Sequence, residues 1–423
     1  MTRANFRAPM ADIQPLRAIH YAQGAGPLDR LAAPPYDVID ADLRRDLASR
    51  SPHNVVEIDL PEGEDPYAHA AELFEQWQMD GVLTRDREHA LWALTQTYRA
   101  PDGTERVRHG FFCRVRITDY GPGAIRPHER THPAAKEDRL RLMRATRANL
   151  SPIFSLYDDP PGQAWSALEP ATESAPWGEV TDDDGTVHRL WRVADPDAIA
   201  RAQAALADAE LLIADGHHRY ETARTYAQEV GGEGDHNYVL MCLVSMSDPG
   251  LTVFPTHRLV GKLEDDRRAR LEDELQRDFD VDEVDARHVV PEGENGVPTY
   301  GYLDRGGRSL RLRLGSPATV DRALADHSPS YRSLDTAVLE KLVLEDALGL
   351  TEEDISHQHG LAYARDLDQA RDLLGSGEYE IAFLLRPTPI EQVQAVAQAG
   401  ETMPPKSTYF YPKLLSGLLF NPL

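Results

Sequence analysis

The sequence contains few cysteines. Only two occur among 423 residues, Cys113 and Cys242, and each lies in an apolar run where a free thiol packs as a small buried side chain. Two cysteines exclude a disulfide framework and favour a reducing compartment. We therefore expect a cytoplasmic protein.

Long apolar runs are missing as well. The longest, 238–244, is far shorter than the roughly 20 residues that a helix needs to cross a bilayer. The first residues, MTRANFRAPM, contain no apolar core of a signal peptide. We expect neither a membrane span nor a signal peptide.

Positive charge is scarce, since 70 Asp and Glu residues face 45 Lys and Arg residues and the net charge is −25. Such a surface repels the phosphates of nucleic acids and anionic lipids, so no direct nucleic-acid partner is expected. The excess of acidic residues, together with the use of arginine in place of lysine, fits a salt-adapted source or a G+C-rich genome. The lysines number only five: Lys136, Lys262, Lys341, Lys406 and Lys413.

The remaining composition is that of a globular enzyme-sized protein. Hydrophobic residues make up 41% and charged residues 27% of the chain, which is typical of folded domains. Mixed helix and strand signals predict an α+β fold with mixed sheets. A charge shift at 264–268 suggests a larger domain over 1–262 and a smaller α/β domain over 263–423.

Local patterns predict the main elements. Asp65 and Pro66 open a helix that extends to about Met79, and the apolar run 55–60 is interpreted as a buried strand. Turn residues predict three hairpins. The expected hairpins cover 89–118, 238–260 and 299–314, and 158–186 is expected to be a surface excursion.

The sharpest local signal is the segment DGHHRY. An apolar strand at 210–214 ends in Asp215 and Gly216, and a helix follows to about residue 230. A glycine turn and the positive end of a helix suit phosphate binding, and Arg219 adds a bidentate donor. His217 and His218 point in different directions, so at most one faces the same ligand as Arg219.

Two other interpretations of this segment stay open. Asp215 can simply cap the helix, with the basic residues forming a solvated first turn. His217 and Glu221 also have the i, i+4 spacing of metal ligands, although matching ligands are missing nearby.

A second polar segment, His128-Glu129-Arg130-Thr131-His132, matches the zincin pattern H-E-x-x-H. Pro133 disfavours the helical conformation at His132 that this chemistry needs, so a zincin helix is not predicted here. Glu129, His128 and His132 remain candidates for acid–base catalysis or for contacts to a divalent metal or a phosphate. A polar surface loop is the plainer alternative.

A third segment lies near the C-terminus, where two prolines precede Lys406 and Ser407. A rare lysine beside a hydroxyl in a rigid loop can bind phosphate or a carboxylate. The alternative is a capping turn near the C-terminus that binds no ligand. Walker A, G-x-G-x-x-G and G-x-S-x-G motifs do not occur in the sequence.

Several of these segments together resemble the prokaryotic domain-of-unknown-function family 1015. The resemblance covers nearly the whole chain, and His132 departs from the usual family pattern. The motifs that carry it are AAPPYDVID (32–40), RPHERTHPAAKEDRLR (126–141), IADGHHRYETA (213–223), FPTHRLV (254–260) and MPPKSTYFYPKLLSGLLFNPL (403–423).

The DGHHR element is in turn similar to the phosphate-binding strand–loop–helix of the ParB/sulfiredoxin superfamily, which includes free serine kinases. This resemblance implies a ParB/sulfiredoxin-like larger domain and a nucleotide-phosphate cradle at 215–219. It does not identify a catalytic carboxylate, and fold analogy alone does not fix function.

The first hypothesis is a phosphotransferase that uses ATP or ADP with Mg²⁺ and acts on the hydroxyl of a small metabolite, with free serine as the leading substrate. Its proposed catalytic residues are Glu129 as general base, His128 as the alternative, and Asp215, which would orient a histidine or hold Mg²⁺. Its proposed binding residues are Gly216, His217, His218, Arg219, Lys406 and Ser407.

The second hypothesis is a nucleotide-binding regulatory switch without metabolite turnover, which would keep the cradle but not need Glu129 or Lys406. The third is a metal hydrolase that uses His128 and His132. The sequence does not predict an oligomeric state.

Overall fold

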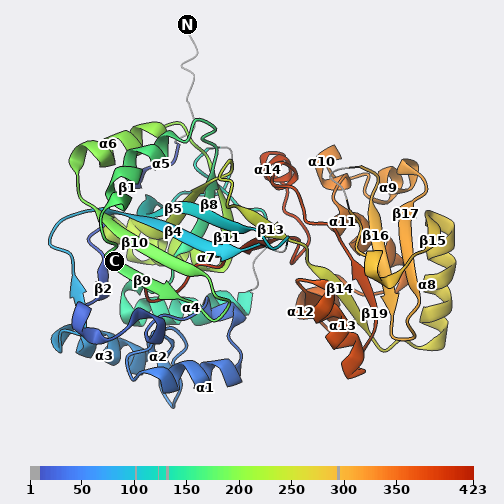
Figure 1. Cartoon of the computed structure of the whole chain (residues 1–423), viewed down its shortest axis with the longest axis horizontal. Coiled ribbons are helices and arrows are strands. Elements are labelled where there is room, and N and C mark those ends of the chain that lie inside the picture. The colour runs from blue at the N-terminus through green and yellow to red at the C-terminus, as the bar shows by residue number, and fades with distance from the viewer. Residues whose placement is uncertain (1–9, 101, 122, 130–132, 293–295) are drawn as a thin grey trace, which may run out of the picture. The chain divides into compact units, whose positions relative to one another are not determined.

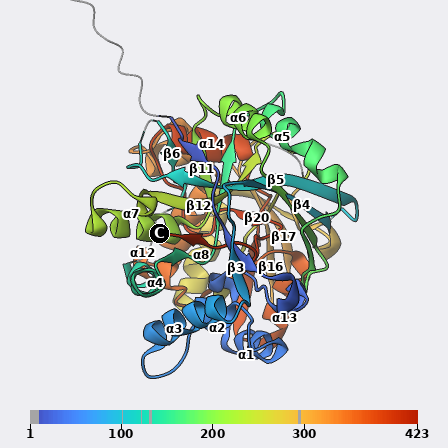
Figure 2. The same ribbon diagram turned by 90° about the vertical axis from the view of Figure 1, so that its left-hand side faces the viewer.

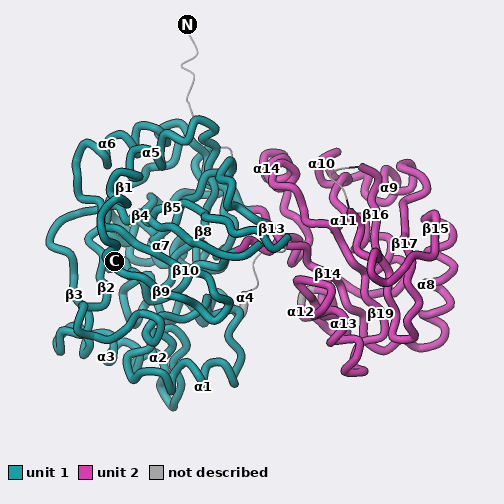
Figure 3. Tube along the Cα trace, viewed as in Figure 1, with its two compact units in different colours: residues 1–127, 131–252, 412–423 teal, residues 128–130, 253–411 magenta. Residues whose placement is uncertain are grey.

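The protein forms two compact units in the computed structural model, which describes residues 10–100, 102–121, 123–129, 133–292 and 296–423. Unit 1 comprises Met1–Pro127, Thr131–Thr252 and Pro412–Leu423, and unit 2 comprises His128–Arg130 and Val253–Tyr411 (Figure 3). The boundary expected at residue 262 falls between a strand and a helix of unit 2. The chain therefore returns to unit 1 for its last residues.

Unit 1 is built on a mixed sheet with the strand order β6-β11-β8-β12-β5-β4-β10-β9, and β1 pairs with β5. The β11–β6 and β12–β8 pairs are parallel, and the other pairs are antiparallel. The strands of this sheet are β1 (Ile13–Gln14), β4 (Leu91–Arg99), β5 (Glu105–Arg116), β6 (Ile125–Arg126), β8 (Ile153–Tyr157), β9 (Gly178–Thr181), β10 (Val187–Val193), β11 (Leu211–Asp215) and β12 (Tyr238–Ser245).

Helices cover this sheet and a smaller layer of short strands (Figure 1). The helices are α1 (Ala41–Arg50), α2 (Val56–Asp59), α3 (Pro66–Met79), α4 (Pro133–Thr146), α5 (Gln163–Leu168), α6 (Pro196–Ala205) and α7 (His217–Val230). Two short antiparallel pairs join β2 (Ile19–Tyr21) to β3 (Leu83–Arg85) and β7 (Ala148–Asn149) to β21 (Asn421–Pro422).

Two apolar clusters form the core of unit 1. One joins the sheet to α5, α6 and α7 through buried side chains such as Phe111, Ala202 and Tyr220. The other lies among α2, α3 and the short strands, and Phe74, Trp77 and Phe420 belong to it. Helices α3 and α4 pack side by side (Figure 2). The second cluster thus depends on Phe420, close to the C-terminal end.

Unit 2 contains an antiparallel sheet with the order β15-β17-β16-β19-β14-β18. Its strands are β14 (His257–Gly261), β15 (Phe279–Glu283), β16 (Thr299–Asp304), β17 (Ser309–Leu314), β18 (Leu361–Ala364) and β19 (Tyr379–Leu384). A separate pair is formed by β13 (Thr252–Phe254) and β20 (Tyr409–Tyr411).

The helices of unit 2 are α8 (Asp265–Asp278), α9 (Pro317–Ala323), α10 (Pro329–Arg332), α11 (Asp335–Leu339), α12 (Glu352–His357), α13 (Leu367–Ser376) and α14 (Ile390–Gln398). A π-helical segment, η7 (Glu340–Ala347), continues α11. Within the described ranges, no helix has the length and apolar character that crossing a bilayer requires.

The α+β class with mixed sheets is confirmed, as are the 89–118 and 299–314 hairpins. The strand predicted at 55–60 is wrong, because this run forms helix α2. The Asn54 side chain accepts a hydrogen bond from the Val56 N–H at 3.0 Å, which starts the helical turn. A short apolar run does not by itself distinguish a buried strand from a buried helical turn.

Two other sequence predictions also need correction. The hairpin expected at 238–260 does not form, because β12 pairs with β5 and β8 whereas β14 pairs with β18 and β19. The turn residues at 247–250 mark the passage between the two units instead. The segment 158–186 is not only a surface excursion, since α5 buries Ala164 and Leu168.

A pH dependence follows from His257, which is 1% exposed at the start of β14. Its Nδ1 accepts a hydrogen bond from the Leu385 N–H at 3.1 Å, so the ring is neutral. Burial lowers the pKa of His257 to about 4, whereas the unfolded chain has its ordinary value near 6.5. The unfolded state therefore binds the proton first as the pH falls.

We expect His257 to stabilise the protein fully above pH 6.5 and to lose about 2 kcal/mol of that contribution at pH 5. The variant His257→Asn keeps an acceptor oxygen but does not titrate. Urea unfolding at pH 7 and pH 5 should show a smaller loss of stability in the variant than in the wild type. Equal losses in both proteins would contradict this assignment.

Candidate functional site

The junction between β11 and α7 in unit 1 is the centre of the site. β11 is buried in the mixed sheet, its last residue is Asp215, and α7 begins at His217 after Gly216. The N-cap residue of α7 is Gly216, which has no side chain with which to cap the helix. The N–H groups of a first helical turn lack partners within their own helix, and the positive end of the dipole attracts anions.

Gly216 is required at this turn for two reasons. Its φ of 99° lies in the left-handed region, which only glycine adopts without strain. A Cβ atom at this position would also lie 3.0 Å from Nε of Arg219. The guanidinium of Arg219 therefore folds back against the turn from which its helix starts.

Two cations meet at Asp215. Nη2 of Arg219 donates to one carboxylate oxygen at 3.0 Å, and Nζ of Lys413 lies 3.5 Å from the other. All three side chains are between 11% and 19% exposed. Arg219 also donates to the carbonyl of Pro152. Each oxygen of the Asp215 carboxylate therefore faces a cation at the α7 entrance.

Lys413 reaches this position because hydrogen bonds hold the C-terminal segment of unit 1 against the rest of that unit. The Lys413 carbonyl accepts a hydrogen bond from Nε2 of Gln96, a fully buried side chain, at 3.1 Å. Further along, Ser416 bridges to Ala33 and Phe420 to Ile19. The backbone of Lys413 is therefore held by the Gln96 side chain, and the residues that follow it are held by bridges to the N-terminal segment.

The charge of Arg219 is secure despite its burial. Burial alone would lower the pKa of Arg219, but the neighbouring charges of Asp215, Asp37 and Asp59 raise the pKa above its ordinary value. Burial also raises the pKa of Tyr36 to about 12. At neutral pH this neighbourhood therefore contains a permanent cation and a protonated phenol.

The two histidines of the motif differ in exposure. The His217 side chain is buried, with 5% of the residue exposed, and His218 is half-buried. His218 is the better placed of the two for a ligand that approaches from solvent.

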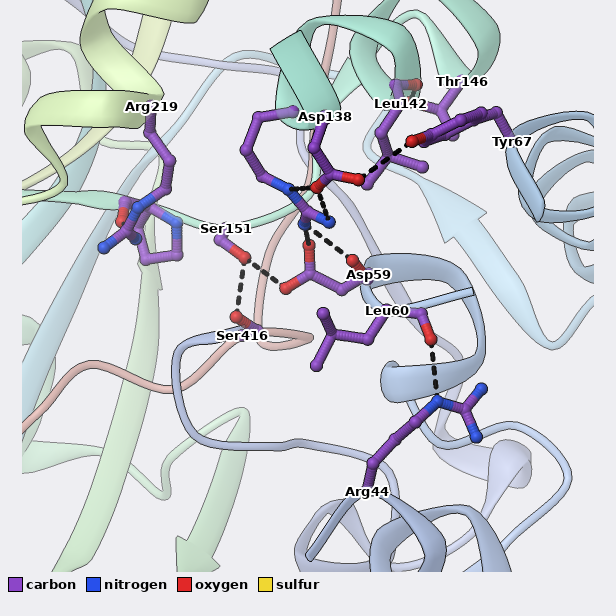
Figure 4. Close-up of polar contacts among 12 residues, drawn as sticks. Arg44, Asp59, Leu60, Tyr67, Asp138, Leu142, Thr146, Ser151, Arg219 and Ser416 are labelled. Atoms are coloured by element: carbon purple, nitrogen blue, oxygen red, sulfur yellow. Dashed lines mark hydrogen bonds and ion pairs between the residues drawn. The ribbon is translucent and has the colours of Figure 1, made fainter. Parts of the chain in front are cut away.

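A buried polar network lies beside the junction (Figure 4). Asp59 accepts hydrogen bonds from Nη1 of Arg139 at 3.2 Å and from the Ser151 hydroxyl at 2.7 Å. The Ser151 hydroxyl is also 2.6 Å from that of Ser416. Asp59 and Arg139 are each 7% exposed at the side chain, so this ion pair is shielded from water.

A cavity of about 40 Å³ lies between the β11–α7 junction and the Asp59 network. Its lining includes Tyr36, Asp59, Ser151 and Arg219. Such a volume holds a few water molecules, which is too little for a nucleotide or an amino acid. Arg219 and the Asp59 network therefore line the same small cavity.

The other predicted residues belong to unit 2. The His128 ring is 1% exposed, its Nε2 lies 2.9 Å from Oγ1 of Thr408, and it packs edge-on against Phe410. Glu129 is half-buried and accepts a hydrogen bond from the Lys406 N–H at 3.1 Å. Of this pair, Glu129 is the more accessible acid–base group.

Lys406 and Ser407 share a turn with Glu129. The Lys406 side chain is exposed, whereas Ser407 is buried and its hydroxyl donates to the Pro404 carbonyl at 2.7 Å. Ser407 thus supports the turn, and Lys406 is the residue that faces solvent.

The predicted residues therefore form two groups. Unit 1 holds Asp215, Gly216 and Arg219 with both histidines, and unit 2 holds Glu129, Lys406 and the remaining predicted residues. Sequence reasoning did not assign Lys413, Asp59 or Ser151 to a site. Two signals in the sequence could have pointed to Lys413: lysine is scarce in this chain, and Lys413 lies in the C-terminal motif.

Metal ligation is restricted by this arrangement. Within the described residues, no group of three or more His, Cys, Asp or Glu side chains is arranged to hold a metal ion. The H-E-x-x-H interpretation lies partly outside the described residues, which do not include His132. Mg²⁺ needs only one or two protein carboxylates when it also binds phosphates. In this structure the two oxygens of Asp215 face Arg219 and Lys413.

Comparison with known proteins identifies the family. The family described as protein of unknown function (DUF1015) matches the chain over residues 13–337. No curated protein matches the chain.

Solved structures give a wider set of similarities. A conserved hypothetical protein from Pyrococcus furiosus is 17% identical, with 68% of this chain and 86% of that chain covered and a TM-score of 0.35. A free serine kinase in complex with AMP is 14% identical, with 68% and 83% covered and a TM-score of 0.35. C-terminally truncated SbnI from Staphylococcus aureus is 15% identical, with 69% and 82% covered and a TM-score of 0.34.

The network at Asp59 makes a testable contribution to stability. Replacing Asp59 with Ala removes the acceptor of the Ser151 hydroxyl and one of the two carboxylates that contact Arg139, since Asp138 remains at 2.7 Å. We expect a loss of about 1–3 kcal/mol in the free energy of unfolding. A matched control is Asp42→Ala, which removes an exposed ion pair with Arg45 and should cost less than about 1 kcal/mol. Urea unfolding of both variants tests the comparison, and equal losses would contradict a structural role for the network.

Proposed function

We propose that this chain, which belongs to the DUF1015 family, is a nucleotide-dependent phosphotransferase that acts on the hydroxyl of a small metabolite, with free serine as the leading substrate. ATP or ADP would be the donor, with Mg²⁺. The observation that carries the proposal is the pair of cations, Arg219 and Lys413, that meets at Asp215 beside the N-terminus of α7.

Three properties of this entrance favour phosphate as its ligand. The helix dipole places partial positive charge there, Gly216 lets a ligand approach the backbone closely, and two cationic side chains reach it from different segments. In a chain with a net charge of −25, most of the surface repels a nucleotide. A local positive site is therefore needed to bind one.

The same features suit phosphoryl transfer, because this reaction depends mainly on positioning and on stabilising the charge of the phosphoryl oxygens. Gly216, His218 and Arg219 would hold the phosphates, with Lys413 as an additional cation. Buried His217 would position the first turn. Asp215 would supply one oxygen ligand to Mg²⁺, which offsets phosphate charge when bound.

Glu129 is the proposed general base, with His128 as the alternative. In the reaction the acceptor hydroxyl takes the terminal phosphoryl group, whose bond to the bridging oxygen of the donor breaks, and Glu129 takes the hydroxyl proton. Glu129 is preferred because His128 is buried and hydrogen-bonded to Thr408. Lys406, supported by Ser407, would bind an anionic group of the substrate.

The cation cluster is tested by neutralising each member. Lys413→Gln and Arg219→Gln each remove a charge-assisted contact worth about 1.5–3 kcal/mol, so we expect the Kd for ADP or ATP to rise about 10- to 100-fold. Isothermal titration with each nucleotide measures the change.

Matched controls separate this effect from general loss of charge. Lys262→Gln removes an exposed lysine from unit 2, and Arg224→Ala removes a half-buried arginine of α7 that pairs with Glu221 and Asp119. Both controls should leave the Kd within about twofold of the wild type. A Kd that is unchanged in Lys413→Gln and Arg219→Gln would contradict phosphate binding at this entrance.

Catalysis is tested with Glu129→Gln, which keeps an oxygen that accepts the Lys406 N–H but removes the base. We expect phosphoryl transfer to fall about 100-fold or more while the Kd for nucleotide stays unchanged. Phosphorus NMR of the protein with Mg²⁺, nucleotide and a mixture of free amino acids follows the product.

A phosphoserine signal in the wild type that is lost in Glu129→Gln supports the proposal. Nucleotide binding with no phosphorylated product would favour the regulatory switch. Full activity in Glu129→Gln would exclude Glu129 as the base.

A further inference from the structure

The turn that contains Lys406 has an unusual backbone. Pro405 and Lys406 occupy its central positions, and Lys406 has a φ of 56°. A positive φ at the third position characterises a type II turn, where glycine or asparagine is favoured. The chain therefore places a lysine where a smaller residue would fold more easily.

Other residues with this conformation have an ordinary explanation. Arg147 follows the last residue of α4, and Gln358 is the C-cap of α12. A left-handed residue commonly ends a helix. Lys406 follows no helix directly, and a strained residue that the fold retains points to a function.

Arg258 holds this turn in place. Its side chain is almost fully buried, with 2% of the residue exposed. It donates to the carbonyls of Lys406 at 3.0 Å, Pro405 at 3.1 Å and Thr256 at 2.8 Å. Burying a guanidinium is costly unless hydrogen bonds compensate, and here these bonds go to the backbone of the turn.

Two further contacts complete the support. Glu129 accepts the Lys406 N–H at 3.1 Å, and the Ser407 carbonyl accepts the Thr388 hydroxyl at 3.0 Å. The backbone on either side of the lysine is therefore fixed, and only its side chain projects from the turn.

The Lys406 ammonium has no ion pair or hydrogen bond within the described part of the chain. Its side chain is exposed, although acidic residues outnumber basic ones by 70 to 45. By contrast, Lys341 pairs with Glu345 and Asp346, and Lys413 pairs with Asp215. A rigid turn thus presents an exposed lysine whose ammonium makes no ion pair within the described residues.

We propose that Lys406 is a preformed oxyanion-binding residue and that Arg258 is the positioning residue that keeps it in its left-handed conformation. This inference rests on the proposed function for its biological ligand, which would be a carboxylate or phosphate of the small substrate. The oxyanion chemistry itself depends only on the turn.

Lysine-selective NMR tests the binding. The chain has only five lysines, so side-chain signals labelled at Cε are few, and Lys406→Arg assigns the relevant one. Inorganic phosphate and acetate are titrated separately at constant ionic strength. We expect a saturable shift of the Lys406 signal with at least one of them and no saturable shift of exposed Lys262.

The response identifies the ligand chemistry. Saturation with phosphate alone indicates a phosphoryl group, and saturation with acetate indicates a carboxylate. If Lys406 behaves like Lys262 with both anions, the turn presents an ordinary surface lysine and the proposal is wrong.

The positioning role is tested with two variants that retain Lys406. Arg258→Met removes the hydrogen bonds to the turn, and Glu129→Ala removes the acceptor of the Lys406 N–H. We expect either variant that folds, as judged by circular dichroism, to weaken the anion-dependent shift at least fivefold. An undiminished shift in both would overturn the role of the supports.

Strain is tested independently with Lys406→Gly. Glycine adopts this φ freely, so we expect the unfolding equilibrium constant to fall about fivefold or more while oxyanion binding at the turn is lost. A destabilised Lys406→Gly protein would overturn the claim that strain is maintained here.

The same spectra separate this proposal from the proposed function. ADP should shift the Lys413 signal through the α7 entrance, whereas inorganic phosphate or acetate tests Lys406. A response of Lys406 without one of Lys413 would leave the turn as an oxyanion site and reject the α7 nucleotide site. A response of Lys413 to ADP without a response of Lys406 to either anion would support the α7 nucleotide site and reject the oxyanion site at the turn.

Discussion

The turn at Gly216 constrains the rest of the candidate site. Its left-handed backbone lets β11 pass directly into α7, and the absence of a side chain lets Arg219 fold back over it. Arg219 then holds Asp215, which Lys413 approaches from the C-terminal segment. Gly216 therefore brings a helix N-terminus, the Asp215 carboxylate and the Arg219 cation together, and the C-terminal segment adds Lys413.

Lys413 belongs to the cation cluster because the chain returns to unit 1 at its end. Lys413 contributes to the cluster only because Gln96 holds its carbonyl and because Ser416 and Phe420 bridge to the N-terminal segment. The buried Asp59–Arg139–Ser151 network lies beside the same elements and reaches Ser416. Fold stability and site geometry in unit 1 thus depend on shared contacts.

Much of this arrangement could be predicted from local patterns. The apolar strand before Asp215, the glycine and the helix after it have strong signals, and the hairpin of β4 and β5 follows from its turn residues. The helical turn at Asp59 could not be distinguished from a strand, because a short apolar run suits both. The pairing of Lys413 with Asp215 joins distant parts of the chain, and no local pattern encodes such a contact.

Hydrogen–deuterium exchange of the α7 entrance tests the central claim most directly. The exchange of amides 216–220 would be measured in the free protein, with ADP and Mg²⁺, and with adenosine and Mg²⁺. Phosphate binding by these amides predicts slower exchange with ADP and little change with adenosine. Unchanged exchange at saturating ADP, or equal protection by adenosine, would contradict the account.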